Sequence, residues 1–430
     1  MIENFEFSLK FKNIRKQNFQ KYSFPSGLHI IYGESDVGKS ELIQLLASNV
    51  QSCESELFAI ENCNILKNKI VIAQNPDFQI IGNTIEQELA FSLECHSNDS
   101  NEIQSKLKKI KNNLLLSGDL KRHPNTLSGG EKELLNIATA ISQSPRVLLI
   151  DDSLSFLSSA VKERIVRKIF PKHTKQSIIM WFTSDDYDLK FGDTKWEMTN
   201  SKLKSLIPQP QIKFPKVILP PGKLSLFINE LDFSYDNQRP IFSNFSISKT
   251  HFRCLGITGE NGSGKSTLAA LLSKLEKPNA GSIKLKCKSR KNINLGYLDQ
   301  FPEKTLGILS PNDFIKLLIK NNKLAGSQIH DISTILKSLD IDWYKVNNLH
   351  AIDLPWTTLR VILIVILTKC KYDLLIFDEP TFGMGNRQKQ ILFSHFNKYL
   401  MNKHLILISH DSKFIDELCD SKITLENNGK

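Results

Sequence analysis

The chain has 430 residues, of which 40% are hydrophobic and 23% are charged, and its formal net charge is +11. This length and composition exclude a disordered chain and a single small domain, and they predict two globular domains of roughly 200 residues each. No apolar run approaches the roughly 20 residues that cross a bilayer, and Met1–Lys10 lacks the apolar core of a signal peptide. We therefore expect a protein of the cytoplasm.

The positive charge and the cysteines both fit an ordinary cytoplasmic protein. A net charge of +11 would suit a nucleic-acid partner or an anionic membrane surface. No long Lys/Arg run marks such a patch, so solvated surface charge is the favoured interpretation. The seven cysteines are scattered and form no C-x-x-C pair, which argues against a zinc or iron–sulfur site.

The first recognisable element is a strand that runs into a glycine-rich loop. Leu28–Tyr32 is the predicted strand, and the loop reads G-E-S-D-V-G-K-S. Glycines let successive backbone N–H groups point at phosphate, and the following helix adds its N-terminal dipole. Lys39 would reach the β- and γ-phosphates of a nucleotide, and Ser40 would offer its hydroxyl to Mg²⁺. The predicted nucleotide-binding residues are Gly33, Glu34, Ser35, Asp36, Val37, Gly38, Lys39 and Ser40.

The rest of the first half carries two further landmarks. Leu127–Glu131 reads LSGGE, and the apolar strand Val147–Ile150 ends at Asp151. A carboxylate at the end of such a strand is where P-loop ATPases place a second Mg²⁺-facing group. Ile178–Thr183 follows as another apolar strand. Strands that alternate with helices predict a mainly parallel sheet with helices on both faces.

A proline-rich connector separates the two halves. Leu206–Lys223 holds five of the sixteen prolines. Proline fixes φ and removes amide donors, so this stretch is predicted to be a short, stiff, extended linker. The predicted organisation is a first domain at 1–205, a linker at 206–223 and a second domain at 224–430.

The second half repeats the first. The recurring pairs, at offsets of 226 or 227 residues, are Lys39 with Lys265, Gln74 with Gln300, Leu127 with Leu354, Asp151 with Asp378, and Ser184 with His410. Cys254–Thr258 is the strand before the second loop, and a whole domain is therefore duplicated. The nucleotide-binding residues predicted around the second loop are Gly259, Glu260, Asn261, Gly262, Ser263, Gly264, Lys265, Ser266 and Thr267.

These motifs resemble those of ABC nucleotide-binding domains. Leu127–Glu131 is similar to the LSGGQ/E signature, Asp378–Thr381 to the Walker B tail, and Ser409–Asp411 to the switch-histidine loop. The resemblance covers nearly the whole chain except the linker. It implies two tandem α/β P-loop NTPase domains, each with a helical signature subdomain, which pair intramolecularly around two ATP molecules. The Mg²⁺ positions that it implies are Ser40, Gln74, Asp151, Ser266, Gln300 and Asp378.

A narrower likeness concerns the segment that begins at Gln74. Gln74–Gln79 and Thr84–Phe91 are similar to the Q-loop region of the ATPases of energy-coupling-factor (ECF) transporters, which import vitamins and transition metals. It implies membrane-spanning partner subunits and a place at the cytoplasmic face of the membrane. Apolar residues of this segment would then contact the partner, or they pack internally. These residues are Phe78, Ile80, Ile81 and Phe91.

An ATPase of another class remains as the alternative: a soluble twin ABC protein that acts on ribosomes or nucleic acid. Translation-factor relatives separate their halves by a long charged helical linker, whereas this connector is short and proline-rich. The second signature is also lost. We therefore expect no nucleic-acid partner.

The two predicted ATP sites are unequal. For the site on the second loop, the resemblance implies Glu379 as the general base and His410 as the residue that holds the γ-phosphate. It also implies that Tyr235 stacks on adenine. The first half would lend this site its signature at Ser128, Gly129 and Gly130.

The site on the first loop departs from the family pattern at three places. Asp152 replaces the catalytic glutamate, Ser184 replaces the switch histidine, and the second signature carries Pro355 and Trp356. A catalytic group misplaced by about 1 Å can cost roughly a hundredfold in rate. We therefore predict one hydrolytic site and one that binds ATP but turns it over slowly.

Smaller departures affect both sites. Ser158 and Gly385 stand where the family has its D-loop aspartate, and the first half offers only Leu9 or Phe11 for adenine stacking. The alternative is that all these variants are tolerated and that both sites hydrolyse ATP.

Overall fold

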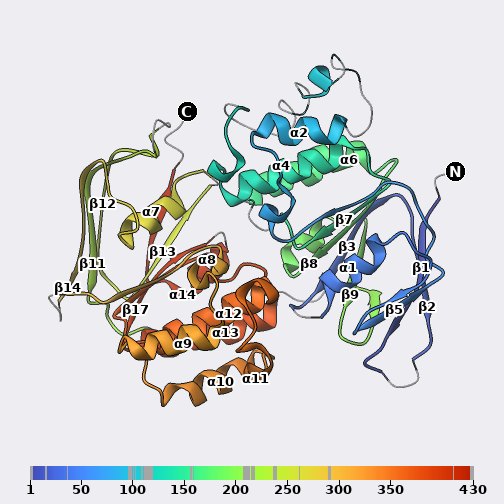
Figure 1. Ribbon diagram of the computed structural model, residues 1–430. Coiled ribbons are helices and arrows are strands. Elements are labelled where there is room, and N and C mark those ends of the chain that lie inside the picture. Colours follow the sequence, from blue (N-terminus) through green and yellow to red (C-terminus); the bar gives the residue numbers. More distant parts are fainter. Residues whose placement is uncertain are drawn as a thin grey trace. The chain divides into compact units, whose positions relative to one another are not determined.

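The computed structural model (Figure 1) describes residues 3–14, 17–35, 37–94, 99, 101, 103–107, 110, 120–154, 157, 159–206, 214, 218–235, 240–260, 262–288, 292–409 and 411–426. Four residues named above lie outside the described residues, as does much of the predicted linker: Asp36, Ser158, Asn261 and His410. The chain divides into two compact units. Unit 1 comprises Met1–Gln211 with Gly383–Asn386, and unit 2 comprises Ile212–Phe382 with Arg387–Lys430.

Unit 1 contains two sheets. The four-stranded antiparallel sheet has the order β2-β1-β5-β4, from β1 (Phe5–Phe11), β2 (Gln20–Phe24), β4 (Cys53–Glu54) and β5 (Phe58–Glu61). The six-stranded sheet has the order β10-β9-β3-β8-β7-β6, from β3 (Gly27–Gly33), β6 (Lys69–Ile72), β7 (Val147–Asp151), β8 (Ile178–Thr183), β9 (Thr194–Met198) and β10 (Leu203–Ser205). All its pairs are parallel except β9 with β10.

The helices of unit 1 cover both faces of the six-stranded sheet. They are α1 (Lys39–Ala47), η1 (Pro76–Gln79), α2 (Ile85–Glu94), η2 (Pro124–Thr126), α4 (Gly129–Ser142), α5 (Ser159–Arg164), η3 (Ile165–Ile169), α6 (Phe170–His173) and η4 (Asp186–Lys190). Neighbouring residues of β3 point to opposite faces, so Ile31 joins the core under α1 and the antiparallel sheet, while Ile30 joins the core under α2 and α4. With both faces covered, all six residues of β8 are buried.

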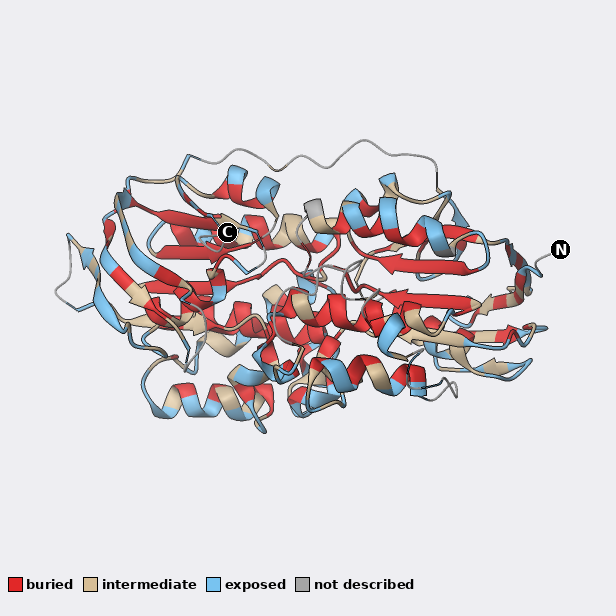
Figure 2. Ribbon diagram, turned by 90° about the horizontal axis from the view of Figure 1, so that it is seen from above, coloured by how far each residue is buried: buried red, intermediate tan, exposed pale blue. Residues whose placement is uncertain are grey.

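Unit 2 repeats this plan. Its antiparallel sheet has the order β12-β11-β14, from β11 (Leu224–Phe233), β12 (Phe242–Phe252) and β14 (Ala280–Cys287). Its parallel sheet has the order β15-β16-β17-β13-β18, from β13 (Cys254–Gly259), β15 (Leu295–Leu298), β16 (Leu374–Asp378), β17 (His404–Ile408) and β18 (Ser421–Leu425). The two central strands β16 and β17 are buried along their whole length, and Figure 2 draws buried residues in red.

The helices of unit 2 also lie on both faces of the parallel sheet. They are α7 (Lys265–Leu272), α8 (Pro302–Leu306), α9 (Pro311–Lys320), α10 (Gln328–Ser338), α11 (Trp343–Val346), η5 (Ala351–Asp353), α12 (Trp356–Lys369), α13 (Asn386–Leu400) and α14 (Ser412–Leu418). Leu268 of α7 packs against Ile257 of β13 in one core. On the other face, the ring of Phe377 stacks on Phe396 of α13, with centroids 5.7 Å apart.

The predicted fold class is therefore confirmed: two α/β units, each with a mainly parallel sheet covered by helices. Within the described part of the chain, every helix is too short or too polar to cross a membrane.

Candidate nucleotide sites

The first phosphate loop connects β3 to α1. Gly38 has φ 88° at the N-cap of α1, a left-handed conformation that favours glycine. A Cβ at Gly38 would also lie 2.7 Å from the ring of Phe58, so the position excludes any side chain. The ammonium of Lys39 is buried and donates to the carbonyl oxygens of Gly33 (2.9 Å) and Glu34 (3.0 Å). The loop therefore wraps a cation, and the N-terminus of a nine-residue helix follows it.

The second phosphate loop has the same geometry between β13 and α7. Gly264 has φ 88° at the N-cap of α7. The ammonium of Lys265 donates to the carbonyl oxygens of Gly259 and Glu260, both at 2.9 Å. Burial lowers the pKa of Lys265, and the carboxylates of Glu379 and Asp378 oppose that shift. The described parts of the two loops thus share the left-handed glycine before the lysine and the hydrogen bonds from the lysine to two loop carbonyls.

A buried carboxylate ends the strand beside each loop. Asp151 ends β7 and Asp378 ends β16, and both are buried. Burial raises the pKa of Asp151 to about 6 and that of Asp378 to about 7, and the hydroxyls of Ser40 and Ser266, respectively, oppose these shifts.

The oxygens of this second carboxylate fit a metal ion. Within the described residues, the Ser266 hydroxyl lies near the Asp378 carboxylate, but neither carboxylate oxygen accepts a well-directed hydrogen bond. A buried carboxylate beside a serine hydroxyl and a phosphate loop is the set of hard oxygen ligands that Mg²⁺ prefers. The residues present therefore fit this ion.

The predicted glutamines lie at the same edge as these carboxylates. In the parallel register, Ile72 of β6 pairs with Ile150 of β7, and Leu298 of β15 pairs with Phe377 of β16. Gln74 and Gln300 each follow their strand by two residues. The sheet thus brings each glutamine to the carboxyl edge where its aspartate lies.

An acid follows each of these aspartates: Glu379, the predicted base, and Asp152, which replaces that glutamate in the first half. Glu379 is buried, with φ 51°, and accepts a hydrogen bond from the Ser409 hydroxyl at 3.1 Å. Asp152 is buried, with φ 46°, and accepts from both the N–H (2.9 Å) and the hydroxyl (2.7 Å) of Ser184. The ammonium of Lys39 lies 3.6 Å from the same carboxylate. Ser184, in the switch-histidine position, thus binds the shortened acid directly.

The two signature segments also differ. Ser128 is the N-cap of α4: its hydroxyl accepts from the N–H of Glu131, whose carboxylate accepts from the N–H of Ser128 at 2.9 Å. The capping box fixes the first turn of α4, in which Gly129 and Gly130 carry no side chains. Pro355 holds the equivalent place in α12 and makes no side-chain cap.

Trp356 turns inward in the second signature. Its side chain is 9% exposed and packs against Phe301 and Phe382, with ring centroids 5.6 and 5.5 Å away. Its indole N–H donates to Glu303. The residue that replaces a signature glycine is therefore part of the packing of its own unit.

Comparison with known families assigns the class. The sequence profile described as "ABC transporter" matches residues 19–155 and 242–382, which is more than half of the chain and falls in both halves. The chain belongs to the ABC transporter family. Its two units are ABC domains, and it is an ATPase.

Individual relatives show how far the likeness extends. A Bacillus cereus protein with the provisional name of ABC transporter ATP-binding protein is 22% identical over 83% of this chain and 74% of its own length. The energy-coupling factor transporter ATP-binding protein EcfA1 of Thermotoga maritima is 34% identical over 142 residues, which are 32% of this chain and 54% of that protein. Among solved structures, "RNase-L Inhibitor" has a TM-score of 0.60 at 17% identity and covers 93% of this chain and 84% of that one. That likeness shows the fold.

The residues predicted at the adenine-stacking positions differ in exposure between the two ABC domains. Tyr235, just after β11, is 38% exposed, and its ring meets that of Phe233 edge-on at 5.0 Å. Leu9 and Phe11 lie in β1 and are each only 1% exposed, within the core. Neither of these two residues is therefore available to stack on adenine in the first domain.

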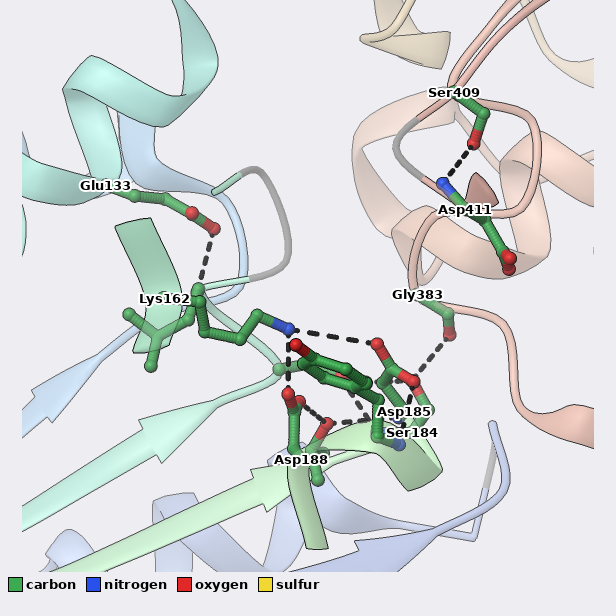
Figure 3. A network of polar contacts seen from close by, with 12 residues as sticks. Glu133, Lys162, Ser184, Asp185, Asp188, Gly383, Ser409 and Asp411 are labelled. Carbon is green, nitrogen blue, oxygen red and sulfur yellow. Dashed lines mark hydrogen bonds and ion pairs between the residues drawn. The ribbon is translucent and has the colours of Figure 1, made fainter. Parts of the chain in front are cut away.

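In each domain, a lysine pairs with an acid just after the switch-histidine position, and neither lysine was identified from the sequence. Lys162 of α5 is buried and lies 2.8 Å from the carboxylate of Asp188 and 3.8 Å from that of Asp185 (Figure 3). Burial alone would lower the pKa of Lys162, but these two acids raise it, so the lysine stays charged. In the second ABC domain, Lys389 pairs with Asp411 at 2.9 Å. The signal for both lysines was available, because they recur at the spacing of the repeat.

The segment after Gln74 is anchored from within and apolar outside. Its backbone N–H groups at Ile81 and Gly82 donate to Glu88 of α2 (2.9 and 2.7 Å), and Lys132 of α4 pairs with Asp77. Ile80 packs against the core, whereas other apolar side chains of this region face solvent. These are Phe78 (72% exposed), Ile81 (67%) and Phe91 (50%).

The second ABC domain also exposes apolar residues beyond its glutamine. Ile308 is 89% exposed and Ile352 is 79% exposed. The two residues belong to adjacent segments, because the His350 ring nitrogen Nδ1 lies 3.3 Å from the carbonyl oxygen of Ile308.

Proposed function

We propose that this ABC ATPase drives a membrane importer of a small solute, a vitamin or a transition metal, through separate membrane-spanning subunits at the cytoplasmic face of the membrane. The observation that carries the proposal is the anchored segment after Gln74, which holds Phe78 and Ile81 in solvent. A large exposed aromatic on a fixed backbone favours burial by a partner. The similarity to EcfA1 over 142 residues supports the same conclusion.

In this proposal, hydrolysis takes place at the loop Gly259–Ser266. Lys265 binds the β- and γ-phosphates of ATP, and Glu379 orients and deprotonates the attacking water. Ser266, Gln300 and Asp378 would hold Mg²⁺, which neutralises phosphate charge when it is bound. The capped signature turn at Ser128–Gly130 serves this nucleotide. Preorganised N–H groups of such a turn would stabilise the negative charge that develops on the γ-phosphate.

The loop Gly33–Ser40 is proposed to bind ATP without fast turnover. The carboxylate of Asp152 already accepts two hydrogen bonds from Ser184 and faces Lys39. This carboxylate is one methylene shorter than that of glutamate and is held by Ser184, so it is misplaced for orienting an attacking water. Ser184 also has no ring nitrogen to hold the γ-phosphate and the water. The site would therefore keep ATP bound and hydrolyse it slowly.

Partner binding gives the test of transport. A tagged chain in which Phe78 and Ile81 are both changed to serine is compared with the parent protein, and Leu275→Ser serves as the matched control. Leu275 is 66% exposed in the second ABC domain, after α7. We expect the parent and the control to sediment with membranes and to co-purify with membrane-spanning proteins, whereas the double variant loses both properties. Equal membrane association of all three proteins would contradict the proposal.

A soluble twin ATPase that acts on ribosomes is the second candidate. Its support is the net charge of +11 and the fold shared with "Model of ribosome-bound archaeal Pelota and ABCE1", with a TM-score of 0.64 at 17% identity over 97% of this chain and 76% of that one. Recovery in the ribosomal fraction, released by raised salt, would favour this candidate over the importer.

A further inference from the structure

A charged side chain is fully buried in the second ABC domain. Arg360 lies in α12 and is 0% exposed. One terminal nitrogen, Nη1, donates to the carbonyl oxygen of Phe382 at 2.7 Å, and the other, Nη2, donates to the carbonyl oxygen of Gln300 at 2.6 Å. These carbonyls belong to the two segments that carry the predicted catalytic and Mg²⁺-facing residues. The fork of the guanidinium therefore bridges the segment after β15 and the segment after β16.

The faces of the guanidinium are covered by aromatic rings. Its central carbon Cζ lies 4.9 Å from the ring centroid of Trp356 and 4.9 Å from that of Phe382. A desolvated cation over such rings is attracted by the negative charge of the ring faces. The tryptophan that removes a signature glycine is therefore also one wall of the arginine site. The residue that replaces the signature glycine therefore packs directly against Arg360.

The first ABC domain carries the opposite charge at the same position. Helices α4 and α12 each have 14 residues, and the fifth residue is Glu133 in α4 and Arg360 in α12. Glu133 is 1% exposed and accepts from the backbone N–H of Leu154 at 2.9 Å. Each side chain thus matches the backbone group that it meets, an N–H for the acid and carbonyls for the arginine. Arg360 therefore makes contacts that the acid at the same position of the first domain could not make.

The acids around Arg360 explain how the charge is tolerated. Burial lowers the pKa of Arg360 to about 10, and the carboxylates of Glu379 and Glu303 oppose the shift. The guanidinium therefore stays protonated at neutral pH. A buried charge is costly unless it is paired and hydrogen-bonded, and removal of one partner is more costly still.

We infer that Arg360 is a positioning residue that ties the Gln300 segment to the Glu379–Phe382 segment, so that a displacement of one reaches the other. The inference rests on the proposed hydrolytic role of Glu379. If the region beyond Gln300 moves on contact with a partner, the two carbonyls held by one rigid guanidinium transmit that motion to the catalytic segment. Arg360 thereby couples partner contact to hydrolysis.

Hydrogen exchange of the nucleotide-free full chain tests the tether directly. In Arg360→Met, we expect at least tenfold faster exchange in residues 298–306 and 379–382, with little change in the phosphate-loop helix at 265–272. Arg360→Lys keeps the charge but loses the fork, so it should fall between Met and the parent. Glu133→Gln is the matched control and should leave both segments unchanged. Uniform acceleration across the second domain, or no change in the two segments, would overturn the inference.

Steady-state kinetics supply the second readout. Arg360→Met should lower kcat for ATP at least tenfold while KM changes less than about twofold, and Arg360→Lys should recover part of the loss. If Arg360→Met does not fold, Trp356→Leu removes one wall of the site and should give a smaller change of the same kind. A raised KM with unchanged kcat would refute the positioning role. If the parent protein has no ATPase activity but the exchange result holds, the hydrolytic role of Glu379 fails and the tether stands.

Discussion

Replacement of Glu379 and of Asp152, one at a time, distinguishes a protein with one hydrolytic site from a protein with two. Glu379→Gln keeps the size of the side chain, and its amide oxygen can still accept the 3.1 Å hydrogen bond from Ser409. The fold should therefore persist while the proton acceptor is lost. General-base catalysis contributes about 10²- to 10⁴-fold, so we expect turnover to fall by at least a hundredfold.

Asp152→Asn is the matched change in the first ABC domain. Its amide oxygen can still accept from the N–H of Ser184, which now lies 2.9 Å from the carboxylate. The variant loses the charge that faces Lys39 at 3.6 Å. Because we assign no proton transfer to Asp152, turnover should change by less than about twofold. A stability loss of about 1 to 3 kcal/mol is expected from the weakened buried contacts.

The assay is steady-state phosphate release by the purified chain with ATP and Mg²⁺. Binding of a fluorescent ATP analogue and a thermal denaturation curve accompany each variant, so that loss of folding is not mistaken for loss of chemistry. A loss of turnover in Asp152→Asn as large as that in Glu379→Gln would refute the unequal-site model. Full activity in Glu379→Gln would refute the assignment of the base.

Three further predictions concern stability and nucleotide binding. Lys162→Met leaves the buried Asp188 without its 2.8 Å partner, so chemical denaturation should show a loss of about 3 kcal/mol, and a loss below about 1 would contradict the pairing. Gly38→Ala places a Cβ 2.7 Å from the Phe58 ring at φ 88°, so nucleotide binding at the first loop should be lost; unchanged binding would refute the packing argument. Burial lowers the pKa of His395 to about 4, so the unfolded chain binds the proton first and the free energy of unfolding should fall as pH drops from 6.5 towards 4. His395→Gln should flatten this dependence of the unfolding free energy on pH. An unchanged slope would contradict the assignment of the dependence to His395.

The phosphate loops could be predicted because their information is local. The glycines at positions that need left-handed backbone, the lysine and the following serine all lie within eight residues. Strand β3 and helix α1 then form on either side of the loop, from an apolar run and a helix-forming run. The repeat added the Asp and Gln landmarks, because duplication preserves register along the chain.

The surroundings of the two acids could only be partly predicted. The sequence predicts that Asp152 is short and that Ser184 lacks a ring. That these two changes meet in one hydrogen-bonded pair beside Lys39 depends on β7 and β8 lying side by side. Contacts between strands far apart in sequence are decided by the sheet, and no spacing along the chain specifies them.

Trp356 shows the same division most clearly. The sequence by itself determined the family, the repeated loops and the loss of the second signature, since each is a pattern of adjacent residues with a steric or chemical reason. Only the tertiary structure decided where the side chain of Trp356 packs. Trp356 packs inward and helps to enclose Arg360, whose two terminal nitrogens donate to carbonyls 22 and 60 residues away. A buried charge is stable only where charged or hydrogen-bonding groups surround it, and the groups around Arg360 come from distant parts of the chain that only folding brings together.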